Sequence, residues 1–106
     1  MTESEFLERS EAALRALERA IDQTDAGIDY NRSGGVLTLE LDNGAKIVVN
    51  TQLPMRQIWV AARSGGFHYS YDGQAWRDTR DQTELFSALS KIISEQSGQP
   101  LVLAVR

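Results

Sequence analysis

Residues 36–50 have the sequence VLTLELDNGAKIVVN, and this stretch determines the predicted fold. Leu37, Leu39 and Leu41 alternate with other residues, a pattern typical of a strand that buries one face. Asn43-Gly44 is a favoured turn dipeptide between hairpin strands. A connection this short joins only antiparallel neighbours. We therefore expect an antiparallel hairpin with strands at 36–41 and 45–50.

The same alternation continues on both sides of this hairpin. Ile58 and Val60 share one face of a predicted strand at 57–62, which follows the break at Leu53-Pro54. Turn residues at 64–66 and at 72–73 then separate two further strands, at 67–71 and 75–78. Residues 28–32 are a candidate strand ahead of the hairpin. The sequence thus predicts an antiparallel meander.

Two amphipathic helices flank the predicted meander. The first carries a capping box at Thr2 and Glu5, and we expect Gly27 to end it. Its apolar face is formed by residues at steps of three or four, namely Phe6, Ser10, Leu14, Leu17 and Ile21.

The second helix is expected at Gln82–Ser97, with Asp81 and Glu84 at its start and Gly98 after its end. Residues 101–105 are predicted to form a short strand or an apolar cover strip. Two such helices need a common apolar surface, which one sheet face can supply. We expect an α+β fold, a two-layer sandwich with both helices on one face of an antiparallel sheet, as one domain over residues 1–106.

Composition excludes several functional classes. The 106 residues contain no Cys and one His, and their net charge is −4. Disulfides, thiolate zinc sites, a catalytic Cys and Cys-ligated iron–sulfur clusters are therefore excluded, and binding to nucleic acid is disfavoured. We also expect no membrane span, no secretory signal and hence a cytoplasmic protein. No spacing indicates a catalytic triad or a pair of catalytic acids, so no enzyme activity is expected.

The negative charge is concentrated near the N-terminus. Residues 1–31 hold eight Asp and Glu and three Arg. Glu11, Arg15, Glu18 and Asp22 fall within about 60° on a helix, and Asp25 joins them if the helix extends that far. Such carboxylates suit hard cations such as iron or calcium. The alternative is an ordinary solvated helix face on which Arg15 neutralises its neighbours.

Trp59 is predicted on the sheet face opposite Ile58 and Val60. The other residues expected on that face are polar: Thr38, Glu40, Lys46, Asn50, Gln57 and His68. A tryptophan on a polar surface is a candidate hot spot for a protein partner. The alternative is a Trp shielded by long neighbouring side chains. His68 is expected to be exposed and without a function.

Residues 34–76 resemble the frataxin family, in particular its bacterial, CyaY-type branch. The resemblance includes Gly34–Thr38, the Asn43-Gly44 turn and Lys46–Asn50. Its most specific part is Asn50-x-Gln52-x-Pro54-x-x-Gln57-Ile58-Trp59, followed by Gly65-Gly66-Phe67-His68-Tyr69 and Trp76. The positions of both predicted helices also agree with the family.

The resemblance implies iron handling for iron–sulfur cluster assembly. Family members bind ferrous and ferric iron weakly along an acidic ridge on the first helix and first strand. They also bind the cysteine desulfurase and the iron–sulfur scaffold protein. The family's metal-binding positions correspond here to Glu11, Glu18, Asp22, Asp25 and Asp29. Its partner-binding positions correspond to Glu18, Asp22, Asn50, Gln52, Gln57 and Trp59.

Three departures from the family pattern are visible. Arg19 and Gln23 occupy positions where a denser ridge carries further carboxylates, and Thr51 stands where a basic residue is common. Because of Arg19 and Gln23 we expect fewer and weaker iron sites than in acid-rich relatives, whereas Thr51 alters the partner-facing sheet surface. The expected protein is a monomeric iron-binding regulator or iron chaperone of cluster assembly. The alternatives are an iron-storage or iron-oxidising oligomer and a metal-independent protein-binding module.

Overall fold

The strands of the protein form one antiparallel sheet in chain order. The computed structural model describes residues 1–103, and within them the sheet order is β1-β2-β3-β4-β5-β6. The elements are α1 (Glu3–Asp22), β1 (Asp29–Ser33), β2 (Val36–Glu40), β3 (Lys46–Gln52), β4 (Gln57–Ala62), β5 (Gly65–Tyr71), β6 (Trp76–Asp78) and α2 (Leu85–Ser97). The predicted meander is confirmed, including the candidate strand before the hairpin.

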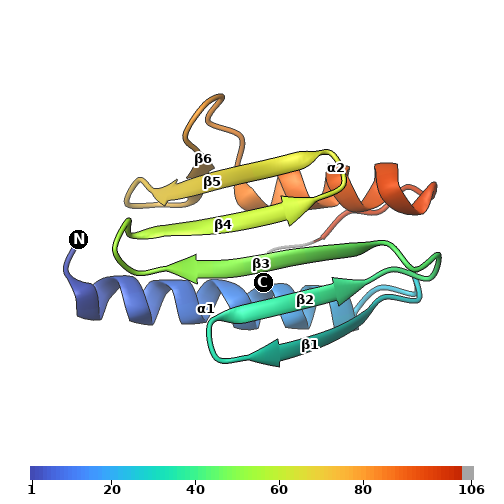
Figure 1. The fold of residues 1–106 in the computed structure, drawn as a ribbon, viewed down its shortest axis with the longest axis horizontal. Helices are drawn as coiled ribbons and strands as arrows, with labels where there is room; N and C mark the ends of the chain where they lie inside the picture. The colour runs from blue at the N-terminus through green and yellow to red at the C-terminus, as the bar shows by residue number, and fades with distance from the viewer. Residues whose placement is uncertain (104–106) are drawn as a thin grey trace.

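Both helices lie on one face of this sheet, α1 along the β1–β3 side and α2 along the β4–β6 side (Figure 1). Every residue of the predicted apolar face of α1 is buried. These side chains meet the inward residues of the strands, among them Leu37, Leu39, Ile58 and Val60. The predicted two-layer α+β sandwich is therefore confirmed, and its core lies between the helices and the sheet.

The hairpin that determined the prediction forms around a three-residue loop. The Leu41 N–H donates to the Ala45 carbonyl at 2.8 Å, and the Gly44 N–H donates back to the Leu41 carbonyl at 2.9 Å. Gly44 has φ +87°, in the left-handed region that glycine enters without steric cost. The loop is thus the three-residue class with glycine at its last position.

Two predicted helix boundaries are wrong. The first helix ends at Asp22 with Gln23 as its C-cap, so Gly27 does not end it. The second helix begins at Leu85 and not at Gln82, whose φ of +67° is incompatible with a right-handed helix. Glu84 is the N-cap and accepts from the Phe86 and Ser87 N–H groups, whereas Asp81 lies before the helix and accepts from the Thr83 N–H.

The segment after α2 is an apolar cover strip as far as it is described. Leu103 is buried, and Leu101 packs against the core. The Ser94 hydroxyl bonds to both the N–H and the carbonyl of Leu101, while the Ser90 hydroxyl accepts from the Leu103 N–H at 2.9 Å. The rest of the predicted strip, 104–105, lies outside the described residues.

No helix within residues 1–103 is long and apolar enough to cross a membrane.

Candidate functional site

The five predicted metal-binding carboxylates, here called the acidic ridge, come from three consecutive parts of the chain. Glu11, Glu18 and Asp22 lie on α1, and Asp22 is its last residue. Asp25 lies in the connection between α1 and β1, because the helix ends before it. Asp29 is the first residue of β1 and is exposed. The fold therefore brings the ridge along the edge where α1 meets β1.

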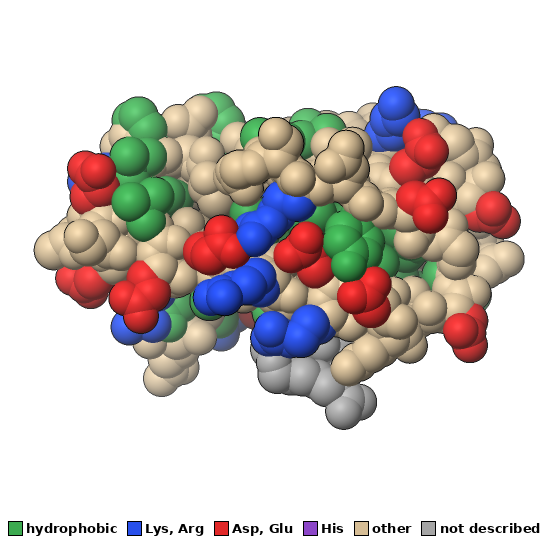
Figure 2. Space-filling model, turned by 90° about the horizontal axis from the view of Figure 1, so that it is seen from below, with side chains coloured by type: hydrophobic (Ala, Val, Ile, Leu, Met, Phe, Trp, Pro, Cys, Tyr) green, Lys and Arg blue, Asp and Glu red, His purple; other side chains and the backbone are tan. Residues whose placement is uncertain are grey.

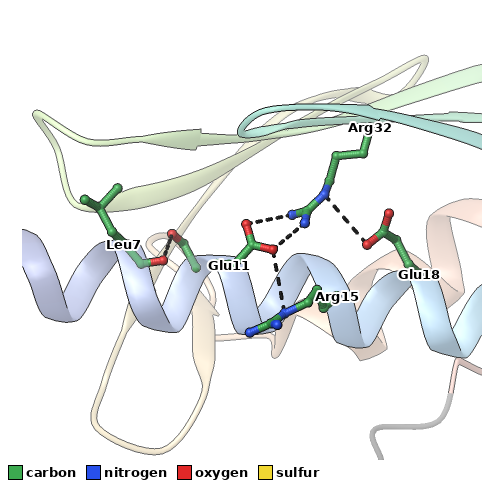
Figure 3. Close-up of polar contacts among 6 residues, drawn as sticks. Leu7, Glu11, Arg15, Glu18 and Arg32 are labelled. Carbon is green, nitrogen blue, oxygen red and sulfur yellow. Dashed lines mark hydrogen bonds and ion pairs between the residues drawn. The ribbon is translucent and has the colours of Figure 1, made fainter.

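An arginine from β1 lies between two of the helical carboxylates. Arg32 donates to both carboxylate oxygens of Glu11, and its Nε lies 3.7 Å from Glu18 (Figure 3). Arg15 also lies 3.6 Å from Glu11. The hydrogen bond from Arg32 lowers the pKa of Glu11 below its ordinary value, and the same bond raises the pKa of Arg32. Glu11 and Glu18 are therefore already neutralised in part.

Asp22 has a different partner on the same strand. The Tyr30 hydroxyl donates to an Asp22 carboxylate oxygen at 3.0 Å. This hydrogen bond is the main reason that the pKa of Tyr30 is raised. Tyr30 and Arg32 are two residues apart, so both side chains leave the same face of β1 and reach toward α1. The bond to Tyr30 leaves the negative charge of Asp22 in place, unlike an ion pair.

The ridge does not form a preformed metal cage. Within residues 1–103, no three His, Cys, Asp or Glu side chains are arranged to hold one metal ion. Seen from the α1 edge, Lys and Arg side chains lie among the Asp and Glu side chains (Figure 2). The composition of residues 1–31 concealed this mixing because Arg32 follows immediately after them in the sequence. A ridge of this kind suits weak, water-mediated attraction of a cation.

The second candidate surface, here called the sheet patch, consists of Asn50, Gln52, Gln57 and Trp59. The strand register places Asn50 opposite Trp59 and Gln52 opposite Gln57. The Trp59 indole N–H donates to the Gln57 side-chain oxygen at 2.8 Å. All four residues are half-buried, and their alternation with the buried Val49, Ile58 and Val60 places them on the sheet face that the helices leave open. The fold thus brings together four of the six residues predicted to contact a partner, while the other two, Glu18 and Asp22, lie on α1.

His68 belongs with this patch, although sequence reasoning gave it no role. It pairs with Trp59 across β4 and β5, and the two rings stack with centroids 4.4 Å apart and planes 13° apart. The stack shields one face of the indole and fixes its orientation. The alternation in 67–69 placed His68 on the right face, but only the register between the two strands shows that it meets Trp59.

Comparison with known proteins gives a consistent result. Residues 1–99 match the model of the frataxin-like domain. The chain is 52% identical over 104 residues to the iron–sulfur cluster assembly protein CyaY of Paraburkholderia phymatum, covering 98% of this chain and 99% of that protein.

Solved structures agree. A frataxin from Psychromonas ingrahamii superimposes with a TM-score of 0.91 at 34% identity, covering 98% of this chain and 99% of that one. A trimeric frataxin from the yeast Saccharomyces cerevisiae, complexed with ferrous iron, gives a TM-score of 0.67 at 27% identity over 93% of this chain and 88% of that one.

Proposed function

The chain belongs to the frataxin family, and from that premise we propose that it acts in iron–sulfur cluster assembly as an iron-binding regulator. In this proposal it carries iron weakly on the acidic ridge and docks as a monomer on the cysteine desulfurase and its scaffold protein. It has no catalytic role of its own. This chain matches relatives over nearly their full length that are named as iron–sulfur cluster assembly proteins, which supports a role in that pathway.

The single observation that carries the iron proposal is that Arg32 pairs with Glu11 and Glu18 and with no other carboxylate of the ridge among the described residues. Asp22, Asp25 and Asp29 keep exposed carboxylates in a continuous part of the chain. Carboxylate oxygens are suitable ligands for hard cations, and few protein ligands per ion imply weak, hydrated binding. We therefore assign the first iron contacts to these three residues. Glu11 and Glu18 contribute less because Arg32 already partly neutralises them.

The docking proposal uses both candidate surfaces. A carboxylate ridge favours a basic groove on the desulfurase and speeds encounter through long-range attraction. Trp59 offers a rigid aromatic anchor within a polar surround, as is typical of interface hot spots. Gln57 holds its indole in one orientation, so little freedom is lost on binding.

An anaerobic titration with ferrous iron, followed by the backbone amide signals of ¹⁵N-labelled protein, tests the iron proposal. We expect paramagnetic broadening centred on Asp22–Asp29, with weaker effects near Glu11. Asp72 and Asp81 are exposed residues next to β6, at the edge of the sheet opposite β1, and their carboxylates serve as internal controls. Equal broadening at the controls, or none at millimolar iron, would contradict iron binding on the ridge.

Light scattering in the same titration separates the monomer from an iron-storing oligomer. A carrier of single ions keeps its particle size as iron is added. Iron-dependent growth in particle size would favour the storage alternative.

A further inference from the structure

A cleft of about 540 Å³ lies on the side of α1 away from the acidic ridge. One wall is formed by small residues of α1, and the opposite side by Trp76 of β6 and Phe86 of α2. The small wall residues, Ala12, Ala13 and Ala16, leave the space that larger side chains would fill. A volume in this range is typical of ligand sites with an apolar lining.

Two arginines of α1 mark the ends of this cleft. Tyr71 holds Arg9 in place. The Arg9 guanidinium donates to the Tyr71 hydroxyl at 3.1 Å, and the centroid of the Tyr71 ring lies 4.8 Å from the guanidinium carbon. Arg19 stands ten residues further on, which corresponds to about 15 Å along the helix. Within residues 1–103, no carboxylate pairs with either guanidinium within 4.0 Å. Both charges are thus available to a ligand.

The acid that lines the cleft, Glu84, forms no ion pair with either arginine among the described residues. Glu84 is the N-cap of α2, and its carboxylate accepts from the Phe86 and Ser87 N–H groups. The third arginine of α1, Arg15, does not line the cleft and pairs with Glu11. Two arginines without a carboxylate partner among the described residues therefore flank an apolar surface.

We propose that this cleft binds an extended acidic segment of a partner protein, with a carboxylate at each end and apolar side chains between them. The distance between the arginines along the helix corresponds to about five extended residues at 3.3 Å each. The charged ends would pair with Arg9 and Arg19, and the centre would pack on Trp76 and the alanine wall. A single-headed fatty acid would satisfy one arginine only, which is why a peptide is the better match.

The test uses the whole chain and the end-capped peptide Glu-Leu-Phe-Leu-Glu as the probe, without iron or desulfurase. We expect amide shifts at Ala12 and Ala16 and a shift of the Trp76 indole signal, with affinity that weakens as salt is added. Arg9→Gln together with Arg19→Gln should reduce the affinity at least tenfold. Arg15→Gln removes one charge from a position of α1 that does not line the cleft and should leave the affinity unchanged, so it is the charge-matched control for Arg19→Gln alone.

Two further arms make the proposal falsifiable even if the double variant is unstable. Ala16→Leu fills the cleft without altering its charge and should also weaken peptide binding, as should Arg19→Gln alone. The proposal is overturned if Lys-Leu-Phe-Leu-Lys binds equally well, or if laurate shifts the cleft signals and the acidic peptide does not. Because neither iron nor the desulfurase is present, failure here leaves the proposed function untouched.

Discussion

Replacing Arg32 by Gln removes the counter-charge that α1 receives from β1. We expect the free energy of unfolding at pH 7 to fall by about 0.5–1 kcal/mol, the range for partly exposed ion pairs. Ferrous iron should bind the ridge several-fold more tightly, because Glu11 and Glu18 lose their competitor. Arg77→Gln breaks the ion pair with Asp72 elsewhere on the surface and should leave iron binding unchanged. Calorimetry under anaerobic conditions measures the affinity.

The stability effect of Arg32→Gln has a defined pH dependence. Arg32 lowers the pKa of Glu11 below its ordinary value of 4.5, so the pair stabilises the fold above that value. The contribution is lost as pH falls through the lowered pKa, where the folded carboxylate becomes protonated. Urea unfolding should show the parent and the variant diverging at pH 7 and converging at an acidic pH below the lowered pKa of Glu11. A gap of the same size at both pH values would mean that Arg32 acts through packing alone.

Gly35 makes a contact that only glycine permits. A Cβ atom at this position would lie 2.2 Å from the Thr51 hydroxyl oxygen. Gly35→Ala should therefore destabilise the protein by about 1–3 kcal/mol, the cost of overpacking. Thr51→Ala should restore most of the loss when combined with it, a coupling expected of residues in contact. Gly66→Ala is the control, because its nearest atom is 4.0 Å away. Strictly additive effects would refute the contact.

At the residue scale, the sequence predicted which side chains form the candidate site but not which residues they contact. Helical spacing alone placed Glu11, Glu18 and Asp22 together, because those positions are close in the chain. It missed Arg32 and Tyr30, the partners of these carboxylates, because they lie beside α1 only through the pairing of β1 with β2. Stacking of His68 on Trp59 likewise depends on the β4–β5 register. Contacts between elements set the local charge of the ridge, and a one-dimensional pattern does not contain them.

At the scale of elements, the predictions succeeded where apolar periodicity was strong and failed at helix ends. Alternation and turn residues located the six strands. The end of α1 was missed because residues 23–26 are compatible with either a helix or a loop, and the glycine beyond them suggested a later stop. The start of α2 was missed because a Gln with positive φ leaves no sequence signal. Helix ends depend on local hydrogen bonds that several sequences can make.

The connection of α2 to the C-terminal strip gives a prediction at the same scale. Ser90 donates to the Phe86 carbonyl at 2.7 Å and accepts from the Leu103 N–H. Ser90→Ala leaves that buried N–H without its partner, so we expect a loss of about 1–3 kcal/mol in the free energy of unfolding. Ser87→Ala, an exposed position on the same helix, should cost less. Denaturant unfolding measures both, and equal losses would show that the strip is not held by Ser90.

The whole molecule presents its two proposed docking surfaces on different sides. The acidic ridge follows the α1–β1 edge, whereas the sheet patch lies on the open face of β3 and β4. Charges and an aromatic anchor act through different forces, one screened by salt and the other largely not. If both surfaces contact the desulfurase–scaffold complex, a substitution in one should weaken binding by an amount that does not depend on substitutions in the other.

The variant Glu18→Lys with Asp22→Lys should weaken binding to the desulfurase steeply and remove most of its salt dependence. Trp59→Ala should weaken binding to the assembled complex while retaining that salt dependence and leaving iron binding intact. Combining all three changes should give additive losses of binding free energy, since the effects of distant sites without shared partners add within about 0.5 kcal/mol.

Glu3→Lys with Glu8→Lys makes the same change in net charge near the start of α1 and is the control for non-specific repulsion. Affinity unchanged by the ridge variant, or equal losses from the control, would exclude the ridge as a docking surface. Unchanged affinity in Trp59→Ala would reduce that residue to a structural role in its stack with His68.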